Sequence, residues 1–114
     1  MIFKPGVVLR LQPDMAVALP IIDDAHQSAD LDRLAVVTSA NDGTHMAGSL
    51  HAKGLAIDLR TKDLHAVSIA VLANELRRHL NGKADINRPY QVVVEERPPH
   101  IHVEYQPVPG GTDA

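Results

Sequence analysis

Residues 91–105, QVVVEERPPHIHVEY, decide the fold of this chain. The valine-rich run at residues 91–96 predicts a strand, Pro98 and Pro99 predict a turn, and residues 100–105 predict a second strand. Successive side chains of a strand point to opposite faces of the sheet. The apolar face of the second strand holds Ile101, Val103 and Tyr105, and its polar face holds His100, His102 and Glu104. We therefore expect a sheet with one face in the core and two imidazoles on the other.

The preceding segments predict further strands of the same sheet. Residues 54–60 (GLAIDLR) alternate in the same way, which indicates a half-buried strand with Asp58 on its polar face. The continuous apolar run at residues 34–38 (LAVVT) favours a buried strand. Residues 7–12, after a turn, predict a short strand near the N-terminus.

Two segments have helical spacing of their apolar residues. Pro20 interrupts the first, residues 15–28, so that segment predicts either one kinked helix or two short ones. We expect Asp63 to cap the second helix, residues 64–80, and the Asn-Gly pair at residues 81–82 to end it. The apolar face of this second helix is predicted to comprise Val67, Ala70, Val71 and Leu76.

This order of elements predicts an α+β fold in which a small, mostly antiparallel sheet packs with helices. The length of 114 residues indicates one domain, which we place at residues 1–106, followed by a flexible tail at residues 107–114. With 45% hydrophobic residues, the chain can bury a core without disulfides or a structural metal. A metal bound here is therefore expected to serve function rather than folding.

Composition excludes several classes of function. The chain has no cysteine, which rules out cysteine-based zinc fingers and thiol nucleophiles. Its formal net charge of −3 gives no basic surface for nucleic acid or an anionic membrane. No apolar run approaches the roughly 20 residues of a membrane span, and the N-terminus lacks the pattern of a signal peptide. We expect a soluble protein, either cytoplasmic or delivered to its site of action by a route that needs no signal peptide. We expect no nucleic-acid or membrane partner and leave the oligomeric state open.

Three side chains predict a metal site. His51 and Asp58 would lie on opposite faces of a continuous strand, so both reach one ion only if the chain bends, and Gly54 provides a place to bend. With His102 they make two imidazoles and one carboxylate, which suits zinc with one position left to water. A His-x-His pair alone is more often structural, so the pattern gains weight only from its combination with the other segment.

The two segments together resemble a known family. Residues 49–58 (SLHAKGLAID) resemble the Ser-x-His-x-x-Gly-x-Ala-x-Asp signature of the zinc D-alanyl-D-alanine carboxypeptidases and dipeptidases. The same signature occurs in the hedgehog signalling domain and in phage L-alanyl-D-glutamate endopeptidases. Residues 96–102 (ERPPHIH) resemble the second half of that site, with hedgehog-like spacing. The resemblance covers residues 36–105 and implies a hedgehog/D-Ala-D-Ala-peptidase-like fold.

The resemblance also implies the roles of individual residues. It implies three zinc ligands, His51, Asp58 and His102. Glu96 would be the general base on the attacking water, with Glu95 as its rival. His45 and His100 would stabilise the oxyanion.

The expected function is that of a zinc metallopeptidase acting on peptidoglycan stem peptides, as a carboxypeptidase or an endopeptidase. A phage product delivered to the cell wall would fit the missing signal peptide. The sequence departs from many cell-wall enzymes where they carry an arginine to grip a substrate carboxylate, since Ser39 is followed by Ala40 and Asn41. The alternative is a non-catalytic zinc-binding recognition module that resembles the hedgehog domain.

Overall fold

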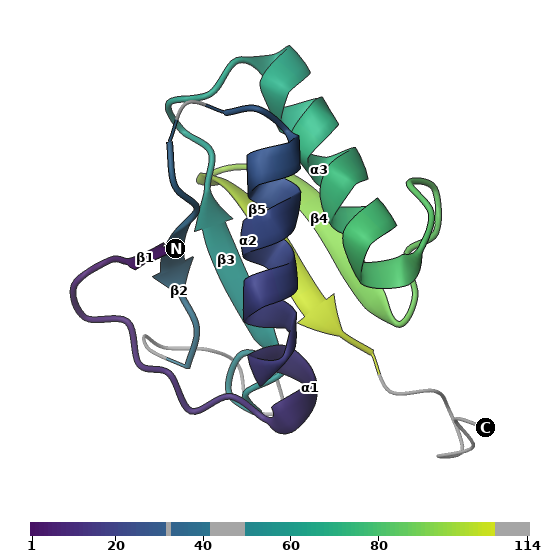
Figure 1. The fold of residues 1–114 in the computed structure, drawn as a ribbon. Helices are drawn as coiled ribbons and strands as arrows, with labels where there is room; N and C mark the ends of the chain where they lie inside the picture. The colour runs from purple at the N-terminus through teal and green to yellow at the C-terminus, as the bar shows by residue number, and fades with distance from the viewer. Residues whose placement is uncertain (32, 42–49, 107–114) are drawn as a thin grey trace.

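One sheet with two helices across one of its faces forms the framework of the protein (Figure 1). The structure, a computed structural model, describes residues 1–31, 33–41 and 50–106. The strands run in the order β1-β2-β3-β5-β4. The elements are β1 (Ile2–Phe3), α1 (Pro13–Ala16), α2 (Ala18–Ser28), β2 (Val36–Ser39), β3 (Ala56–Arg60), α3 (Ala66–Asn81), β4 (Tyr90–Glu96) and β5 (Pro99–Tyr105).

The α+β class is confirmed, but the sheet is mixed rather than mostly antiparallel as predicted. Strands β2, β3, β5 and β4 pair antiparallel, whereas β1 pairs with β2 in parallel through Ile2 and Val36. The predicted strand at residues 7–12 is also wrong. The chain turns at Gly6, whose φ is 92°, and residues 7–12 make isolated backbone hydrogen bonds to loops instead of a ladder. The parallel edge strand therefore comes from a shorter and earlier segment.

The first helical segment forms two helices, which was one of the two predicted alternatives. The break is at Val17, between α1 and α2, and Pro20 lies in the first turn of α2. Backbone N–H groups of a first turn have no partner within the helix, so proline costs no hydrogen bond there.

Helix α3 is confirmed, with two corrections. It begins at Ala66 after His65, and Asp63 makes no cap but pairs with Arg33 at 2.6 Å. Gly82 ends it with φ of 89°, as predicted. The buried face comprises Leu72, Ala73 and the predicted Leu76, whereas the predicted Val67, Ala70 and Val71 are exposed. Both sets have helical spacing, and packing against α2 and β4 selects between them.

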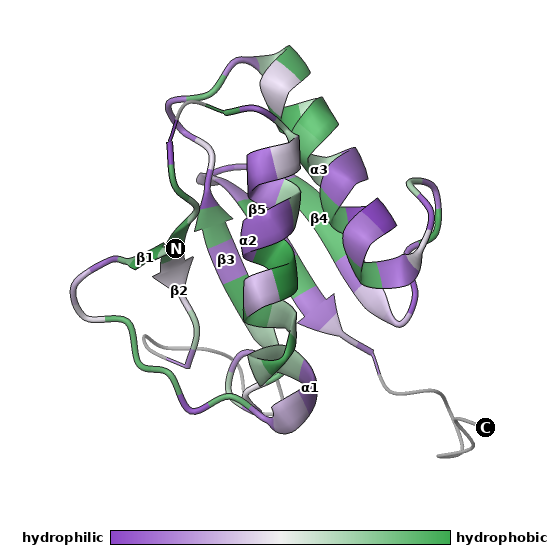
Figure 2. Cartoon of the chain, viewed as in Figure 1, coloured by the Kyte–Doolittle hydropathy of each residue, from purple (hydrophilic) through white to green (hydrophobic). Residues whose placement is uncertain are grey.

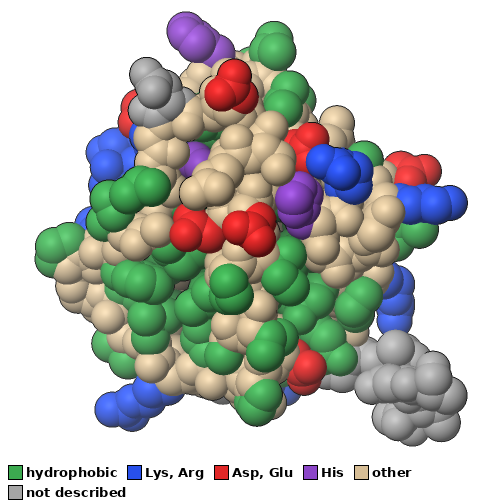
Figure 3. All heavy atoms as spheres, viewed as in Figure 1, with side chains coloured by type: hydrophobic (Ala, Val, Ile, Leu, Met, Phe, Trp, Pro, Cys, Tyr) green, Lys and Arg blue, Asp and Glu red, His purple; other side chains and the backbone are tan. Residues whose placement is uncertain are grey.

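The core lies between the sheet and the two long helices. Its buried residues from the sheet include the predicted alternating ones, Ile57 and Leu59 in β3 and Ile101 and Val103 in β5, and Val37, Tyr90 and Val92 from the flanking strands. Figure 2 shows this alternation as bands of hydrophobic and hydrophilic colour along the strands. In Figure 3 further apolar side chains lie on the helix side of the molecule, mainly where Figure 1 places α1 and the N-terminal segment. None of the described helices is long and apolar enough to cross a membrane.

Candidate metal centre

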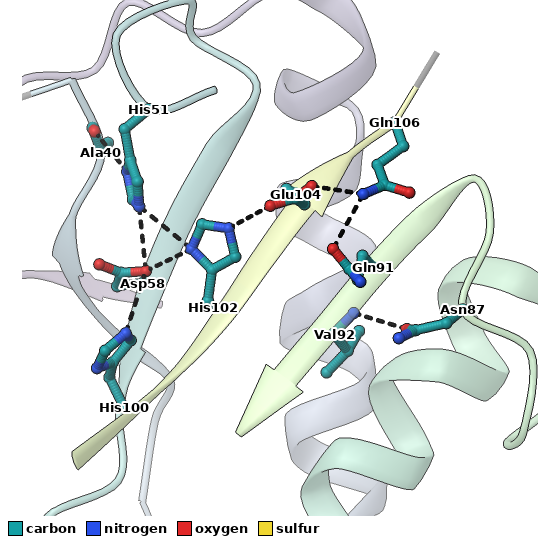
Figure 4. A network of polar contacts seen from close by, with 10 residues as sticks. All are labelled: Ala40, His51, Asp58, Asn87, Gln91, Val92, His100, His102, Glu104 and Gln106. Carbon is teal, nitrogen blue, oxygen red and sulfur yellow. Dashed lines mark hydrogen bonds and ion pairs between the residues drawn. The ribbon is translucent and has the colours of Figure 1, made fainter. Parts of the chain in front are cut away.

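Three predicted ligands meet on the face of the sheet that faces away from the core. Oδ1 of Asp58 lies 3.2 Å from Nε2 of His51 and 3.0 Å from Nδ1 of His102. The two imidazole nitrogens are 3.2 Å apart (Figure 4). This group is the one set of three histidine or acidic side chains, within the described part of the chain, whose ligand atoms are close enough for one metal ion.

Strand register explains why Asp58 and His102 meet. They are directly opposite each other in the antiparallel pair β3–β5. Directly opposite residues of such a pair share a face of the sheet. Their neighbours Ile57 and Val103 point the other way into the core, so core packing fixes the direction of both ligands.

The third ligand, His51, reaches the site through the predicted bend. Gly54 has φ of 75°, and its N–H donates to the carbonyl of His51 at 3.1 Å. A side chain at Gly54 would collide with the backbone carbonyl of Arg10. Both the dihedral angle and this close approach require glycine. The bend turns His51 back over β3, so the expectation of a turn at this position is confirmed.

Hydrogen bonds fix the direction of both imidazoles. Nδ1 of His51 donates to the carbonyl oxygen of Ala40 at 2.8 Å, and Nε2 of His102 donates to Oε1 of Glu104 at 2.6 Å. Each ring therefore uses its outer nitrogen as a donor and turns its other nitrogen, Nε2 of His51 and Nδ1 of His102, toward Asp58. Metal-binding histidines in proteins commonly have this arrangement.

A second layer of polar contacts holds Glu104. The side chain of Gln106 donates to Oε2 of Glu104 at 2.7 Å and to Oε1 of Gln91 at 2.9 Å. The carboxylate thus has partners on both oxygens, which restricts its rotation. Figure 4 shows this chain of contacts running from His51 across the sheet to Gln91.

The electrostatics of the cluster favour a cation. Burial alone would raise the pKa of Asp58, but its contacts with His102 and His51 hold that pKa far below its usual value. Burial alone would lower the pKa of each imidazole, but Asp58 raises the pKa of His51, and Asp58 with Glu104 raises that of His102. The carboxylate thus stays ionised, and positive charge beside it is stabilised.

The donor set fits zinc. A tetrahedral ion with bonds of about 2.0–2.1 Å keeps its ligand atoms about 3.3 Å apart. The observed separations of 3.0–3.2 Å are slightly shorter, so small side-chain shifts would admit the ion. Two imidazoles suit zinc and related transition metals, whereas calcium and magnesium prefer oxygen ligands.

His100 lies at the rim of this centre. Its Nε2 is 3.8 Å from Oδ1 of Asp58, and its Nδ1 donates to the carbonyl oxygen of Pro98 at 2.7 Å. A cavity of about 290 Å³ opens beside it and is bordered by both His100 and Asp58. The cavity therefore adjoins the candidate metal centre on the side of Asp58.

Strand register assigns the two candidate bases to different faces of the sheet, although both residues line a cavity of about 460 Å³ beside α3. Glu95 is paired with His100 across β4 and β5, whereas Glu96 is paired with Pro99. Alternation therefore places Glu95 on the face of the metal centre and Glu96 on the opposite face. Among the described residues, no hydrogen bond or ion pair joins either glutamate to the cluster. His45, the remaining predicted site residue, lies outside the described residues.

Sequence reasoning placed Glu104 on the polar face but assigned it no role, and it missed the carbonyl of Ala40 and Gln106. The available signal for Glu104 was its position two residues after His102 on the same strand, which makes it a neighbour on that face. No sequence signal identifies a backbone carbonyl as the partner of His51.

Searches of protein-family models, of curated proteins and of solved structures found no match to this chain.

Proposed function

We propose that this chain binds Zn²⁺ through His51, Asp58 and His102 and hydrolyses a peptide bond. The observation that carries the proposal is the convergence of three acceptor atoms within 3.2 Å of one another. Two lone pairs and a carboxylate repel one another unless a proton or a metal ion lies among them. Hydrogen bonds on the outer nitrogens of both rings support this arrangement.

The case for catalysis rests on the number of ligands and on the adjoining cavity. Three protein ligands leave a coordination position open, which is typical of catalytic rather than structural zinc. When bound, zinc would acidify a water and polarise a carbonyl group. The cavity beside Asp58 and His100 gives a substrate access to that position.

The other residues have supporting roles in the proposal. A glutamate would accept a proton from the attacking water and pass it to the leaving amine. Strand register favours Glu95 over Glu96 for this role. His100, at the rim, would donate a hydrogen bond to the developing oxyanion, and His45 would share that role as the resemblance implies.

The substrate and the finer fold come from the motif resemblance. Residues 49–58 and 96–102 resemble the zinc D-alanyl-D-alanine peptidases and the hedgehog domain, so we propose a hedgehog/peptidase-like arrangement. Peptidoglycan stem peptides are the proposed substrate, and a phage product acting on the cell wall is the proposed setting.

The test combines metal content with activity. Purified protein loaded with zinc should contain one ion per chain and release fragments from purified cell wall or stem peptides. Asp58→Asn should lose both the metal and the activity, whereas Asp85→Asn, an exposed residue far from the cluster, should retain both. A zinc-loaded wild type that leaves every stem-peptide bond intact contradicts the peptidase proposal.

A second candidate is a zinc-binding recognition module without catalysis. The observation in its favour is that neither candidate base contacts the cluster among the described residues. This candidate predicts stoichiometric zinc, no hydrolysis of any stem peptide, and unchanged properties when either glutamate is replaced by glutamine. The same zinc and digestion measurements therefore separate the two candidates.

A further inference from the structure

The cavity of about 290 Å³ next to the candidate metal centre has an unusual lining. Asp58 and His100 line it, together with Pro98 of the β4–β5 turn and Pro99, the first residue of β5. Strand β2 contributes two hydroxyl groups, those of Thr38 and Ser39. The remaining lining residues are Lys4, Arg60 and Lys62. Three cations thus border one small cavity.

These cations come from separate parts of the chain. Lys4 follows β1, Arg60 ends β3, and Lys62 lies in the turn after it. None of the ion pairs among the described residues involves these three side chains. The acid in the lining, Asp58, is already held by His51 and His102. The cavity therefore has uncompensated positive charge.

We propose that this cavity binds a carboxylate group of the ligand that occupies the metal centre. Arg60 is the principal partner, because a guanidinium can hold a carboxylate with two parallel hydrogen bonds. Lys4 and Lys62 add positive charge, and Ser39 also lines the cavity, whereas the hydroxyl of Thr38 already donates to the carbonyl oxygen of Asp58 at 3.4 Å. The inference rests on the proposed function for the identity of the ligand as a peptide.

Strand geometry limits how far this carboxylate lies from the reacting bond. Arg60 is two residues beyond Asp58 on β3 and directly opposite His100 on β5. Two residues of a strand span about 7 Å, which is also the span of about two residues of an extended peptide. The carboxylate therefore belongs to one of two residues of the bound peptide. These are the residue that forms the scissile bond and the next residue along the peptide. It is either the C-terminal carboxylate of a short peptide or an acidic side chain in that position.

The experiment measures binding rather than turnover. The probes form two pairs, each with a carboxylate and a neutral control. The first pair is N-acetyl-D-alanyl-D-alanine and its C-terminal amide. The second pair is N-acetyl-L-alanyl-D-glutamic acid with only its side-chain carboxylate free, and the diamide in which no carboxylate remains. Each is titrated into ¹⁵N-labelled protein, metal-free and zinc-loaded, and backbone chemical shifts are followed. We expect probes with a carboxylate to shift the signals of Thr38, Ser39 and His100, and the neutral probes to shift them little.

Variants identify the cations responsible. Arg60→Ala should weaken binding of the carboxylate probes by about tenfold, the loss of one charge-assisted contact. The double variant Lys4→Ala/Lys62→Ala should weaken binding by a smaller factor and reduce its dependence on salt. Lys83→Ala, which removes an exposed cation after α3, is the matched control and should leave binding unchanged. The backbone carbonyl of Arg60 accepts a hydrogen bond from Arg33 at 2.8 Å, and Arg60→Ala retains this carbonyl.

The outcomes separate this inference from the proposed function. Binding that depends on the carboxylate and on Arg60, without hydrolysis of any peptide, supports the cavity assignment and contradicts only the peptidase. Equal binding of the acid and amide probes, or an Arg60→Ala variant with unchanged affinity, overturns the cavity assignment even if the enzyme is active. Tighter binding of inorganic phosphate than of every carboxylate probe also overturns it. The two carboxylate probes show whether a chain end or a side chain supplies the group.

Discussion

Nε2 of His102 lies 2.6 Å from Oε1 of Glu104, two residues further along β5. Because an ionised carboxylate can only accept, this contact places a proton of His102 on Nε2 and leaves Nδ1 to face Asp58, where it can hold a second proton or a metal ion. A residue with no predicted role thus sets the direction of a candidate ligand. Gln106 in turn holds the second oxygen of the same carboxylate at 2.7 Å.

This contact makes the first prediction, for Glu104→Gln. We expect zinc affinity to fall about 10- to 100-fold, the usual effect of losing an outer partner of a metal-binding histidine. The fold should persist, because Glu104 lies on the face of the sheet away from the core. Competition with a chromophoric chelator measures the affinity, and Asp85→Asn serves as the control. An unchanged affinity would mean that Glu104 does not orient His102.

The second prediction concerns Gly54 and uses Gly82 as a matched control. Both have positive φ, 75° and 89°, but only Gly54 has backbone within reach of an added side chain. Gly82→Ala should cost about 1 kcal/mol of unfolding free energy, the cost of the left-handed dihedral angle. Gly54→Ala should cost about 2–4 kcal/mol, because strain and steric collision add.

Urea denaturation of the metal-free proteins gives both values, and the Gly54 variant should in addition bind zinc more weakly because His51 moves. Equal destabilisation at the two positions would contradict the role assigned to the bend.

The third prediction concerns how the contribution of Asp58 to the free energy of unfolding depends on pH. This dependence should have one sign in the metal-free protein and the opposite sign in the zinc-loaded protein. The pKa values of His51 and His102 are raised in the folded, metal-free protein, mainly because Asp58 outweighs the effect of burial. The resulting stabilisation is complete below the unfolded pKa of about 6.5 and is lost as pH rises through the folded values. Zinc competes with those same protons, so its affinity should rise with pH over the same range.

The measurement compares urea denaturation of wild type and Asp58→Asn at several pH values between about 5.5 and 8.5. His26 is a buried imidazole whose pKa is lowered mainly by burial, and it contributes stability that is lost as pH falls. Its contribution is common to both proteins and cancels in their difference. In the absence of zinc, the difference in unfolding free energy between wild type and Asp58→Asn should shrink as pH rises. In the presence of zinc, the same difference should grow as pH rises.

The strands that carry the candidate ligands could be predicted because their alternating apolar and polar residues match the buried and outer faces of the sheet. Alternation alone separates Asp58 from its core-facing neighbours, and the same holds for His102. The bend at Gly54 followed from the need to bring His51 to the same face. Alternation and one glycine thus predict which side chains share a face, while the motif resemblance singled out His51, Asp58 and His102 among them.

The remaining features depend on contacts between distant segments. Strand β1 has two residues and is defined by its pairing with β2, which no local pattern reports. The choice between Leu72 and Val71 as a core position of α3 depends on how the helix packs. The cationic cavity joins Lys4 to Arg60, and only the folded sheet brings the two together. Such features follow from topology rather than from any single segment.

The last prediction separates the two candidate bases. Register places Glu95 opposite His100, on the face of the metal centre, and Glu96 opposite Pro99 on the other face. Glu95→Gln should therefore lower kcat by about 10²–10⁴-fold, the typical contribution of a positioned general base, with zinc content and KM little changed. Glu96→Gln should lower kcat by no more than a few-fold. Steady-state kinetics on the stem peptide that wild type cleaves fastest provide the test. The reverse ranking would show that the β4–β5 turn rearranges when substrate binds, so that Glu96 reaches the attacking water from the strand end.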